Sequence, residues 1–147
     1  MKIFDVSIYI ETSIKGPKTA RAAGEWLVEF VTSSRIPVTR SGIIIKEKTS
    51  ENALALELLK ESLSILTKTC SIRINTKCRH ILQAVENEWP KQWKKNGWRK
   101  AGGKDLANAE LWKEVSELME RHLIEMESGW HEYQDVMLMD VRNRLGK

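Results

Sequence analysis

Cysteine, proline and long apolar runs are scarce in this chain. Of its 147 residues, two are cysteine and three are proline. Cys70 and Cys78 flank a segment that alternates like a strand, and at about 3.3 Å per residue they would lie roughly 25 Å apart, too far for a disulfide. Their spacing also matches no zinc-binding motif. We therefore expect reduced thiols and a cytoplasmic protein.

The chain also lacks the sequence signals of membrane insertion and of repeated architecture. No apolar run approaches the roughly 20 residues that a membrane-spanning helix needs. The first residues alternate as a strand does and do not form the apolar core of a signal peptide. There is no internal repeat, low-complexity stretch or long linker. Residues 1–147 are therefore predicted to form a single domain with its own hydrophobic core.

The excess positive charge is concentrated in one segment. The chain carries 24 Lys and Arg against 20 Asp and Glu, a net charge of +4, and without the cations of this segment the balance would be 18 against 20, a net charge of −2. The six cations are Lys91, Lys94, Lys95, Arg99, Lys100 and Lys104, with no acidic residue among them. Trp89, Trp93 and Trp98 are interleaved with them, which suits a phosphate backbone flanked by sugars or bases. The alternative is a solvated helix face with structural tryptophans.

Hydrophobic periodicity predicts the order of the secondary structure. Residues 2–13, 24–31 and 36–45 alternate like strands with short turns between them, which predicts an antiparallel meander. A polar N-cap near Thr49 and leucines at helical spacing then predict a helix that ends near residue 67. Further along we expect a strand over 70–76, a helix over 78–88, the basic segment, a helix over 108–121, a strand over 122–127 and a helix over 131–143.

The basic segment also has a family resemblance. Residues 93–98 read W-K-K-N-G-W, and a basic glycine loop and N-x-x-L-W at 108–112 follow. This pattern resembles the basic protrusion, or handle, of the ribonuclease HI family and the helix after it. The predicted order of elements is also that of the ribonuclease H fold. The resemblance therefore implies an α/β fold with a mixed five-stranded sheet, three strands antiparallel and then two parallel, helices on both faces, and a handle at about 89–107.

The same resemblance implies an enzyme that cleaves the RNA strand of RNA–DNA hybrids with four carboxylates and two magnesium ions. Two of the matching positions keep an acid here. Glu11 stands at the end of the first strand, and Asp135 stands in the last helix with Glu132 on a similar face. The other two positions differ, since Ala55 falls at the helix position and Lys77 replaces the carboxylate that would bridge the metals.

These replacements predict an impaired metal site. The formal charge at the four positions falls from about −4 in the family to about −1 here. A divalent cation about 4 Å from the Lys77 ammonium would cost roughly 8 kcal/mol at an effective dielectric near 20. We therefore expect no metal cofactor, and we expect Lys77 to pair with Glu11 and Asp135. His131 is interpreted either as the remnant of a catalytic histidine of the family or as an ordinary helix-start histidine.

The resemblance also implies which residues would contact nucleic acid. The handle would meet the DNA strand of a hybrid, and polar groups near the first helix would meet the RNA strand. The residues predicted to bind are Trp93, Lys94, Lys95, Trp98, Arg99, Lys100, Lys104 and Asn52. Trp89 and Trp112 are instead predicted to anchor the handle in the core.

Three classes of function stay open. The first is a protein that binds an RNA–DNA hybrid or a related duplex and is catalytically impaired. The second is an active ribonuclease that uses Mg²⁺ or Mn²⁺ in a rearranged site of Glu11, Glu51, Glu132 and Asp135. The third is an interaction domain whose basic helix meets an acidic protein.

Overall fold

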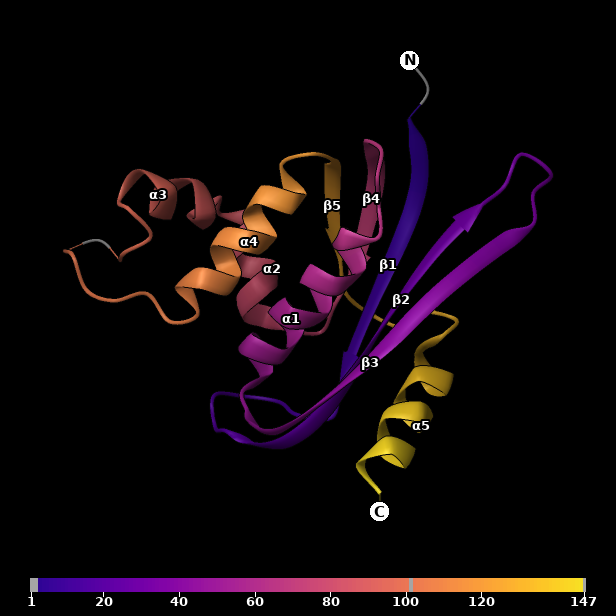
Figure 1. Ribbon diagram of the computed structural model, residues 1–147, viewed down its shortest axis with the longest axis horizontal. Coiled ribbons are helices and arrows are strands. Elements are labelled where there is room, and N and C mark those ends of the chain that lie inside the picture. Colours follow the sequence, from indigo (N-terminus) through magenta and orange to yellow (C-terminus); the bar gives the residue numbers. More distant parts are fainter. Residues whose placement is uncertain (1–2, 101, 147) are drawn as a thin grey trace.

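A five-stranded mixed sheet organises the computed structural model, which describes residues 3–100 and 102–146 (Figure 1). The strand order is β3-β2-β1-β4-β5. The strands are β1 (Phe4–Thr12), β2 (Ala20–Val31), β3 (Pro37–Thr49), β4 (Cys70–Asn75) and β5 (Leu123–Glu127). β1, β2 and β3 pair antiparallel, whereas β4 runs parallel to β1 and β5 parallel to β4. The predicted sheet, three strands antiparallel and then two parallel, is confirmed.

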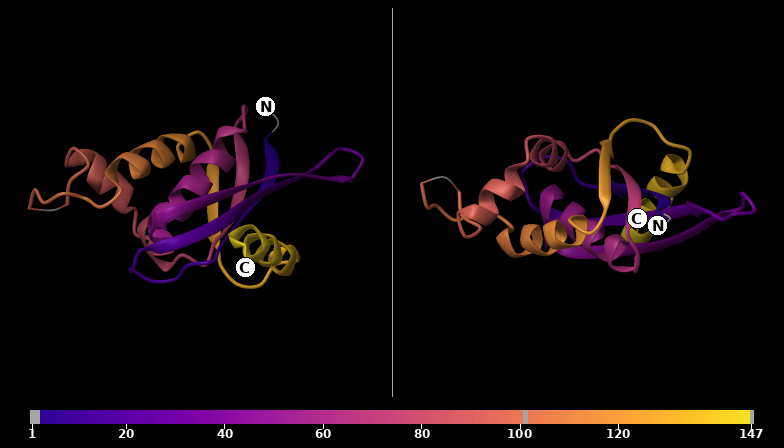
Figure 2. Two further views of the ribbon diagram at one scale, coloured as in Figure 1. Left: turned by 60° about the horizontal axis from the view of Figure 1, so that its bottom comes forward. Right: turned by 90° about the horizontal axis from the view of Figure 1, so that it is seen from above.

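Helices cover both faces of this sheet, as predicted (Figures 1 and 2). They are α1 (Glu51–Ser64), α2 (Arg79–Glu86), α3 (Trp89–Lys95), α4 (Ala109–Met119) and α5 (Gln134–Leu145). α1 and α5 both contact β1, β2 and β3, from opposite sides of the sheet. Among the helices of the described residues, none has the length and apolar character of a membrane span.

Several boundaries differ from the sequence-based expectation, most clearly the start of β2 and the end of β3. β2 begins at Ala20, four residues before Gly24, and β3 continues to Thr49 beyond Ile45. The extensions of β2 and β3 pair with each other. They are therefore defined by backbone hydrogen bonds between neighbouring strands and not by alternation of their side chains. The basic segment also contains a helix of its own, α3, which at 7 residues is too short for a periodic pattern to reveal.

Strand alternation divides the side chains of β1 between the two faces of the sheet. Val6, Ile8 and Ile10 point into the core beneath α1, and each is no more than 5% exposed. Tyr9 and Glu11 alternate with them and therefore point to the opposite face, where α5 lies. This alternation places Glu11 on the α5 side of the sheet.

Gly42 in the edge strand β3 provides a test of how Trp26 packs against that strand. A Cβ atom at residue 42 would lie 2.6 Å from Nε1 of Trp26, which donates a hydrogen bond to Glu61 Oε1 at 2.9 Å. We expect Gly42→Ala to displace the indole and lower the free energy of unfolding by about 1–3 kcal/mol, measured by denaturant titration. Ser41→Ala, at the exposed neighbouring position, should change it by less than about 0.5 kcal/mol. Equal stability of the two variants would contradict this packing.

Candidate functional site

The parallel pairing of β1 and β4 brings Glu11 and Lys77 together at the carboxyl ends of these strands. The Lys77 ammonium donates to Glu11 Oε2 at 2.8 Å and to Asn75 Oδ1 at 3.3 Å. The side chain of Glu11 is 2% exposed and that of Lys77 is 23% exposed. The predicted pairing of Lys77 with Glu11 is confirmed, and it neutralises a carboxylate that is almost fully buried.

His131 contacts the same carboxylate oxygen. Its Nε2 lies 2.7 Å from Glu11 Oε2, and the backbone N–H of Tyr133 donates to its Nδ1 at 3.2 Å. Nδ1 must therefore be unprotonated, so Nε2 carries the proton and donates to Glu11. Burial lowers the pKa of His131, and Glu11 opposes this effect. With Nδ1 accepting and Nε2 donating, neither nitrogen is left free to accept a proton from a substrate.

Two tyrosines hold His131 in place. Tyr9 of β1 stacks on the imidazole with 4.3 Å between the ring centroids, and Tyr133 lies 5.4 Å from Tyr9. The Tyr133 hydroxyl donates to the carboxylate of Glu29 in β2, and this bond raises the pKa of Tyr133. The histidine is thus clamped between β1 and the start of α5. The sequence gives no periodic signal for this arrangement, and only the Glu11 and His131 members were predicted.

Asp135 does not join this cluster. It lies in the first turn of α5 and is exposed, and among the described residues it makes no ion pair with Lys77. The predicted Lys77–Asp135 pair is therefore wrong. The reason is helical geometry: α5 buries Met137 and Val141, and Asp135 lies about 200° around the helix from Met137. Glu132, just before α5, is exposed as well.

The position in the first helix, where the resemblance implies a carboxylate, offers no metal ligand. Ala55 is fully buried in α1, as predicted, and carries no charge. Glu51 faces elsewhere, since its Oε1 accepts the backbone N–H of Gly16 at 3.0 Å and so closes the β1–β2 loop. Within residues 3–100 and 102–146, no three His, Cys, Asp or Glu side chains gather so as to hold a metal ion. The residues present do not fit the pair of magnesium ions that the resemblance implied.

A second buried carboxylate, Glu25, lies beside Glu11 and was not predicted. The two residues are partners across the β1–β2 pair, and Glu25 is only 4% exposed. No hydrogen-bond partner for its Oε1 is found among the described residues. Burial, followed by the carboxylate of Asp140 in α5, raises the pKa of Glu25 to about 7, and Arg144 opposes this effect. The period-two pattern of β2 places Glu25 on this face, but no sequence signal shows that Asp140 would meet it.

The handle projects from the body of the molecule at one end of its long axis (Figure 2). Its base is an aromatic cluster in which Trp93 packs against Trp112 with 5.2 Å between ring centroids and against Trp89 with 6.1 Å. Trp112 is fully buried, which confirms it as a core anchor. Trp89, Trp93 and Trp98 are half-buried and pack against the core.

The six cations of the handle fall into two groups. Lys91, Lys94 and Arg99 pair with Glu88, Glu120 and Asp105 respectively. For Lys95, Lys100 and Lys104, no ion-pair partner is found within the described part of the chain. The last two flank a turn in which Gly102 and Gly103 have φ angles of +89° and +86°, a conformation that favours glycine. Lys95, Lys100 and Lys104 therefore carry the charge that is available to a partner.

Asn52 lies close to the Glu11–Lys77 pair. Its side-chain oxygen accepts a hydrogen bond from the Cys78 thiol at 3.1 Å, and Cys78 directly follows Lys77. Both cysteines are free, as predicted. The start of α1 and the turn after β4 therefore meet at the edge of the sheet that carries Glu11.

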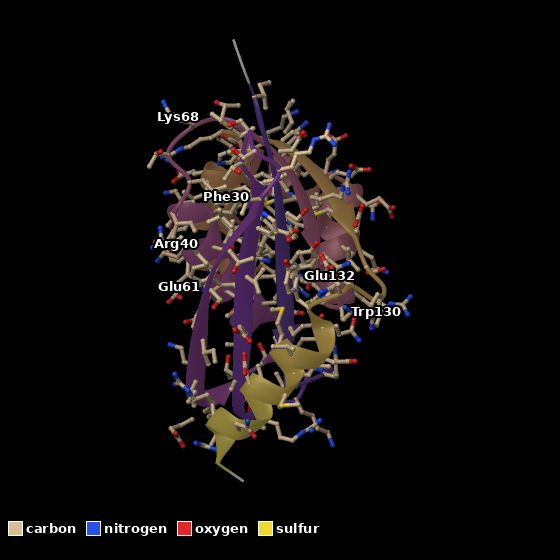
Figure 3. All side chains as sticks on the ribbon, turned by 90° about the vertical axis from the view of Figure 1, so that its right-hand side faces the viewer. Phe30, Arg40, Glu61, Lys68, Trp130 and Glu132 are labelled. Carbon is tan, nitrogen blue, oxygen red and sulfur yellow. The ribbon has the colours of Figure 1, made fainter. Side chains whose placement is uncertain are left out.

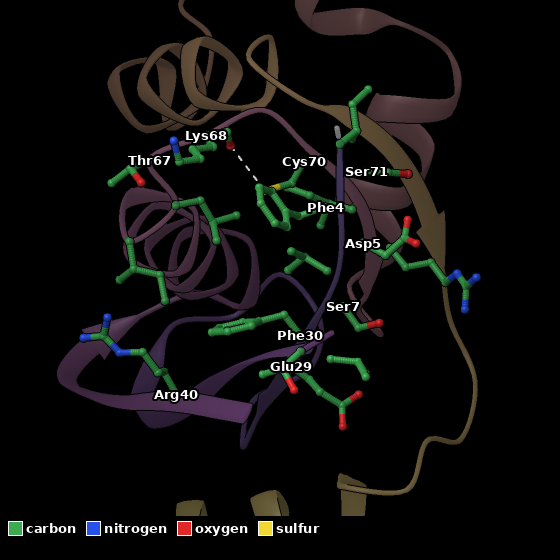
Figure 4. Close-up of a pocket in the computed structure, with 18 of the residues that line it drawn as sticks. Phe4, Asp5, Ser7, Glu29, Phe30, Arg40, Thr67, Lys68, Cys70 and Ser71 are labelled. Atoms are coloured by element: carbon green, nitrogen blue, oxygen red, sulfur yellow. Dashed lines mark hydrogen bonds between the residues drawn. The ribbon is translucent and has the colours of Figure 1, made fainter. Parts of the chain in front are cut away.

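Two cavities of different size lie on the described part of the chain. The larger, of about 920 Å³, lies at the other end of the sheet, where Phe4, Phe30, Arg40 and Lys68 are among its lining residues (Figure 4). Glu11 is seven residues beyond Phe4, or about 23 Å further along β1. The smaller, of about 480 Å³, is lined by Lys77 and lies between α2 and the connection from β5 to α5. Of these two cavities, the smaller adjoins the Glu11–Lys77 pair.

Comparison with protein families and sequences gives a consistent result. The family model described as RNase H matches residues 5–128. A ribonuclease H of Legionella pneumophila (strain Lens) is 30% identical over 126 residues, which is 86% of this chain and 80% of that protein. A ribonuclease H of Clostridium botulinum (strain Hall) is 33% identical over 76 residues, 52% of this chain and 51% of that protein. The chain thus spans about half the length of several of the curated relatives it matches.

Solved structures share the fold at low sequence identity. LC9-RNase H1, a type 1 RNase H with the type 2 active-site motif, aligns with a TM-score of 0.75 and 18% identity, covering 97% of this chain and 74% of that one. The foamy viral protease–reverse transcriptase in complex with dsDNA aligns with a TM-score of 0.65 and 14% identity, covering 95% and 90%. At these identities the likeness concerns the arrangement of elements.

The raised pKa of Glu25 predicts an unusual dependence of stability on pH. Its pKa is about 7 in the folded protein and near the ordinary 4.5 in the unfolded chain. The free energy of unfolding therefore falls as pH rises between these two values, and the loss is complete above them. Glu25→Gln removes the penalty and should raise the free energy of unfolding at pH 8 by about 3 kcal/mol or less, with little gain at pH 4. Denaturant titrations across this pH range measure the difference. The exposed Glu117→Gln is the control, and an equal gain at both pH values would contradict the prediction.

Proposed function

Since this chain belongs to the ribonuclease H family, we propose that it binds an RNA–DNA hybrid or a related duplex through its handle and is catalytically impaired. The observation that carries the proposal is the ion pair of Lys77 with the buried Glu11. It places an ammonium where the family resemblance implies a carboxylate that binds metal. Binding and cleavage therefore have separate structural bases in this chain, and each can be tested alone.

The handle supports binding. Its aromatic base is packed on Trp112, so the segment is held in a defined position and need not order itself on contact. Lys95, Lys100 and Lys104 offer charge for phosphate groups, which dominate affinity for nucleic acid. Exposed pairs such as Arg99–Asp105 contribute little stability, so those cations can exchange partners for phosphate at small cost. The foamy viral protease–reverse transcriptase, which contains this fold, has been solved in complex with dsDNA and with an RNA/DNA hybrid.

The charge of the Glu11 cluster supports catalytic impairment. Glu11 contributes −1 and Lys77 contributes +1, and His131, which accepts a hydrogen bond at Nδ1, adds no negative charge, so the cluster has no net negative charge. Mg²⁺ requires several oxygen ligands in octahedral geometry, usually with carboxylates among them. Here Oε2 of Glu11 already accepts from both Lys77 and His131. Magnesium would have to break these bonds and approach an ammonium that repels it.

The alternative of an active enzyme with a rearranged site has less support. It requires Glu11, Glu51, Glu132 and Asp135 to converge on a metal. Glu51 is tied to the Gly16 backbone, and both Glu132 and Asp135 are exposed. An acidic protein partner for the handle also remains an alternative, and no feature of the described residues favours it over nucleic acid.

The first test concerns the handle. The triple variant Lys95→Ala/Lys100→Ala/Lys104→Ala should bind an RNA–DNA hybrid more weakly. Its plot of log affinity against log salt concentration should flatten by about 0.9 for each phosphate that is no longer neutralised. Fluorescence anisotropy over a salt series measures both quantities. The control Lys46→Ala/Lys60→Ala/Lys68→Ala makes the same change in charge outside the handle, and the handle proposal fails if the two variants behave alike.

The second test concerns the metal site. The wild-type protein should not cleave a labelled hybrid with Mg²⁺ or Mn²⁺, and Mg²⁺ should not raise its melting temperature. Lys77→Asp, alone and with Ala55→Glu, restores acidic ligands and should make the melting temperature depend on Mg²⁺. A ligand at 100 times its dissociation constant stabilises by about 2.7 kcal/mol.

Lys77→Met is the matched control, because it removes the ammonium without adding a ligand, and it should show no response to Mg²⁺. If glutamate at the fully buried position 55 prevents folding, the single variant Lys77→Asp still allows the test. Metal-dependent cleavage by the wild-type protein at an ordinary rate would refute the impairment.

A further inference from the structure

A groove beside the Glu11–Lys77 pair has no role in the function proposed above. It has a volume of about 480 Å³, within the range of small-molecule sites. One wall is formed by Lys77 and by the exposed face of α2, and the other by the connection from β5 to α5. The polar residues that line it are Lys77, Arg79, Gln83, Glu86 and Ser128, with Gly129 completing the second wall.

One end of this groove attracts anions. The Lys77 ammonium has three N–H donors, and Glu11 and Asn75 take two of them, which leaves one. Arg79 is exposed, and no ion-pair partner for it is found among the described residues. Its guanidinium fork matches the geometry of a phosphate group. Glu86 lies seven residues further along α2, about 10 Å away, so the acidic group sits at the other end.

An exposed indole follows directly on the second wall. Trp130 comes after Ser128 and Gly129, and at 70% it has the largest exposed fraction of any large hydrophobic residue in the described chain. Figure 3 shows it at the edge of the molecule, close to Glu132. The tryptophans of the handle are half-buried and pack against the core, whereas most of the Trp130 side chain faces solvent. An indole in this state can stack on a nucleic-acid base.

We propose that this groove binds an unpaired nucleotide of a nucleic-acid strand, with its phosphate between Lys77 and Arg79 and its base stacked on Trp130. The inference rests on the proposed binding of nucleic acid and adds a preference for a single-stranded extension. Binding alone is involved, and no bond is made or broken. The groove and the handle are linked directly, because α3 begins three residues after the end of α2. One strand could therefore contact both.

The nucleotide must be unpaired for a physical reason. A base inside a duplex is stacked on its neighbours through both faces, so neither face is open to an indole. A base in a single-stranded extension offers a free face, and stacking on it is tolerant of sequence because every base has a π surface. The groove therefore distinguishes the end of a duplex from its interior.

The experiment compares a blunt RNA–DNA hybrid with the same hybrid carrying a short single-stranded extension. Wild-type protein should bind the extended hybrid more tightly. Trp130→Ala should lower that affinity at least about fivefold while binding of the blunt hybrid, which depends on the handle, is unchanged. Trp130→Phe should retain most of the preference, since phenylalanine also stacks. Arg79→Gln should reduce the slope of log affinity against log salt concentration for the extended hybrid by about 0.7, the value for one phosphate of a single strand.

A fluorescent base analogue in the extension gives a direct readout of stacking. Its emission should be quenched by the wild-type protein and by Trp130→Phe, and not by Trp130→Ala. Equal affinity of the wild-type protein for the two hybrids, or equal quenching by Trp130→Ala, would overturn the groove and leave the handle proposal intact. Failure of the wild-type protein to bind the blunt hybrid would instead contradict the proposed function itself.

Discussion

The ion pair of Lys77 with Glu11 is the constraint from which the chemistry of this surface follows. A carboxylate that is 2% exposed must be paired or protonated, because an isolated charge is costly to bury. In this chain the partner is an ammonium from the end of β4, where the family resemblance implies a metal ligand. The fold therefore keeps an acid at the end of β1 and pairs it with an ammonium. Removal of Lys77 would leave Glu11 buried and dependent on His131 alone.

The same carboxylate joins α5 to the sheet. Glu11 accepts a hydrogen bond from His131, Tyr9 stacks on that histidine, and the backbone N–H of Tyr133 donates to it. α5 then buries Met137 and Val141 against the sheet, which turns Asp135 outward to solvent. The resemblance would place these acids and the histidine around a metal. Here they either contribute to packing or are exposed to solvent. The buried Glu25 beside them has its pKa raised to about 7, so at neutral pH it adds less negative charge to this face of the sheet than an ordinary carboxylate would.

Local sequence patterns were sufficient to predict much of the fold and part of the site. Alternation in β1 places Val6 and Ile8 in the core and Glu11 on the other face, and the leucine stripe of α1 defines the buried Ala55. The partner of Asp135 was predicted wrongly because its direction depends on which face of α5 docks. The meeting of Glu25 with Asp140 joins residues that lie 115 positions apart, and no local pattern encodes it. Likewise, the sequence does not show which handle cations have ion-pair partners in the described chain, because Lys94 pairs with Glu120, which lies 26 positions away.

Neutralising the site also changes how a strand can lie across it. A cluster of carboxylates repels the phosphate backbone unless divalent ions screen it, so binding and metal occupancy are coupled in such a site. In this chain Lys77 neutralises Glu11, and Arg79 adds a cation beside it. The handle and the Glu11–Lys77 pair then each present cations to phosphate, with Glu86 at the end of α2 that leads to the handle. The substitution that weakens the case for cleavage therefore strengthens the case for a strand that stays bound without metal.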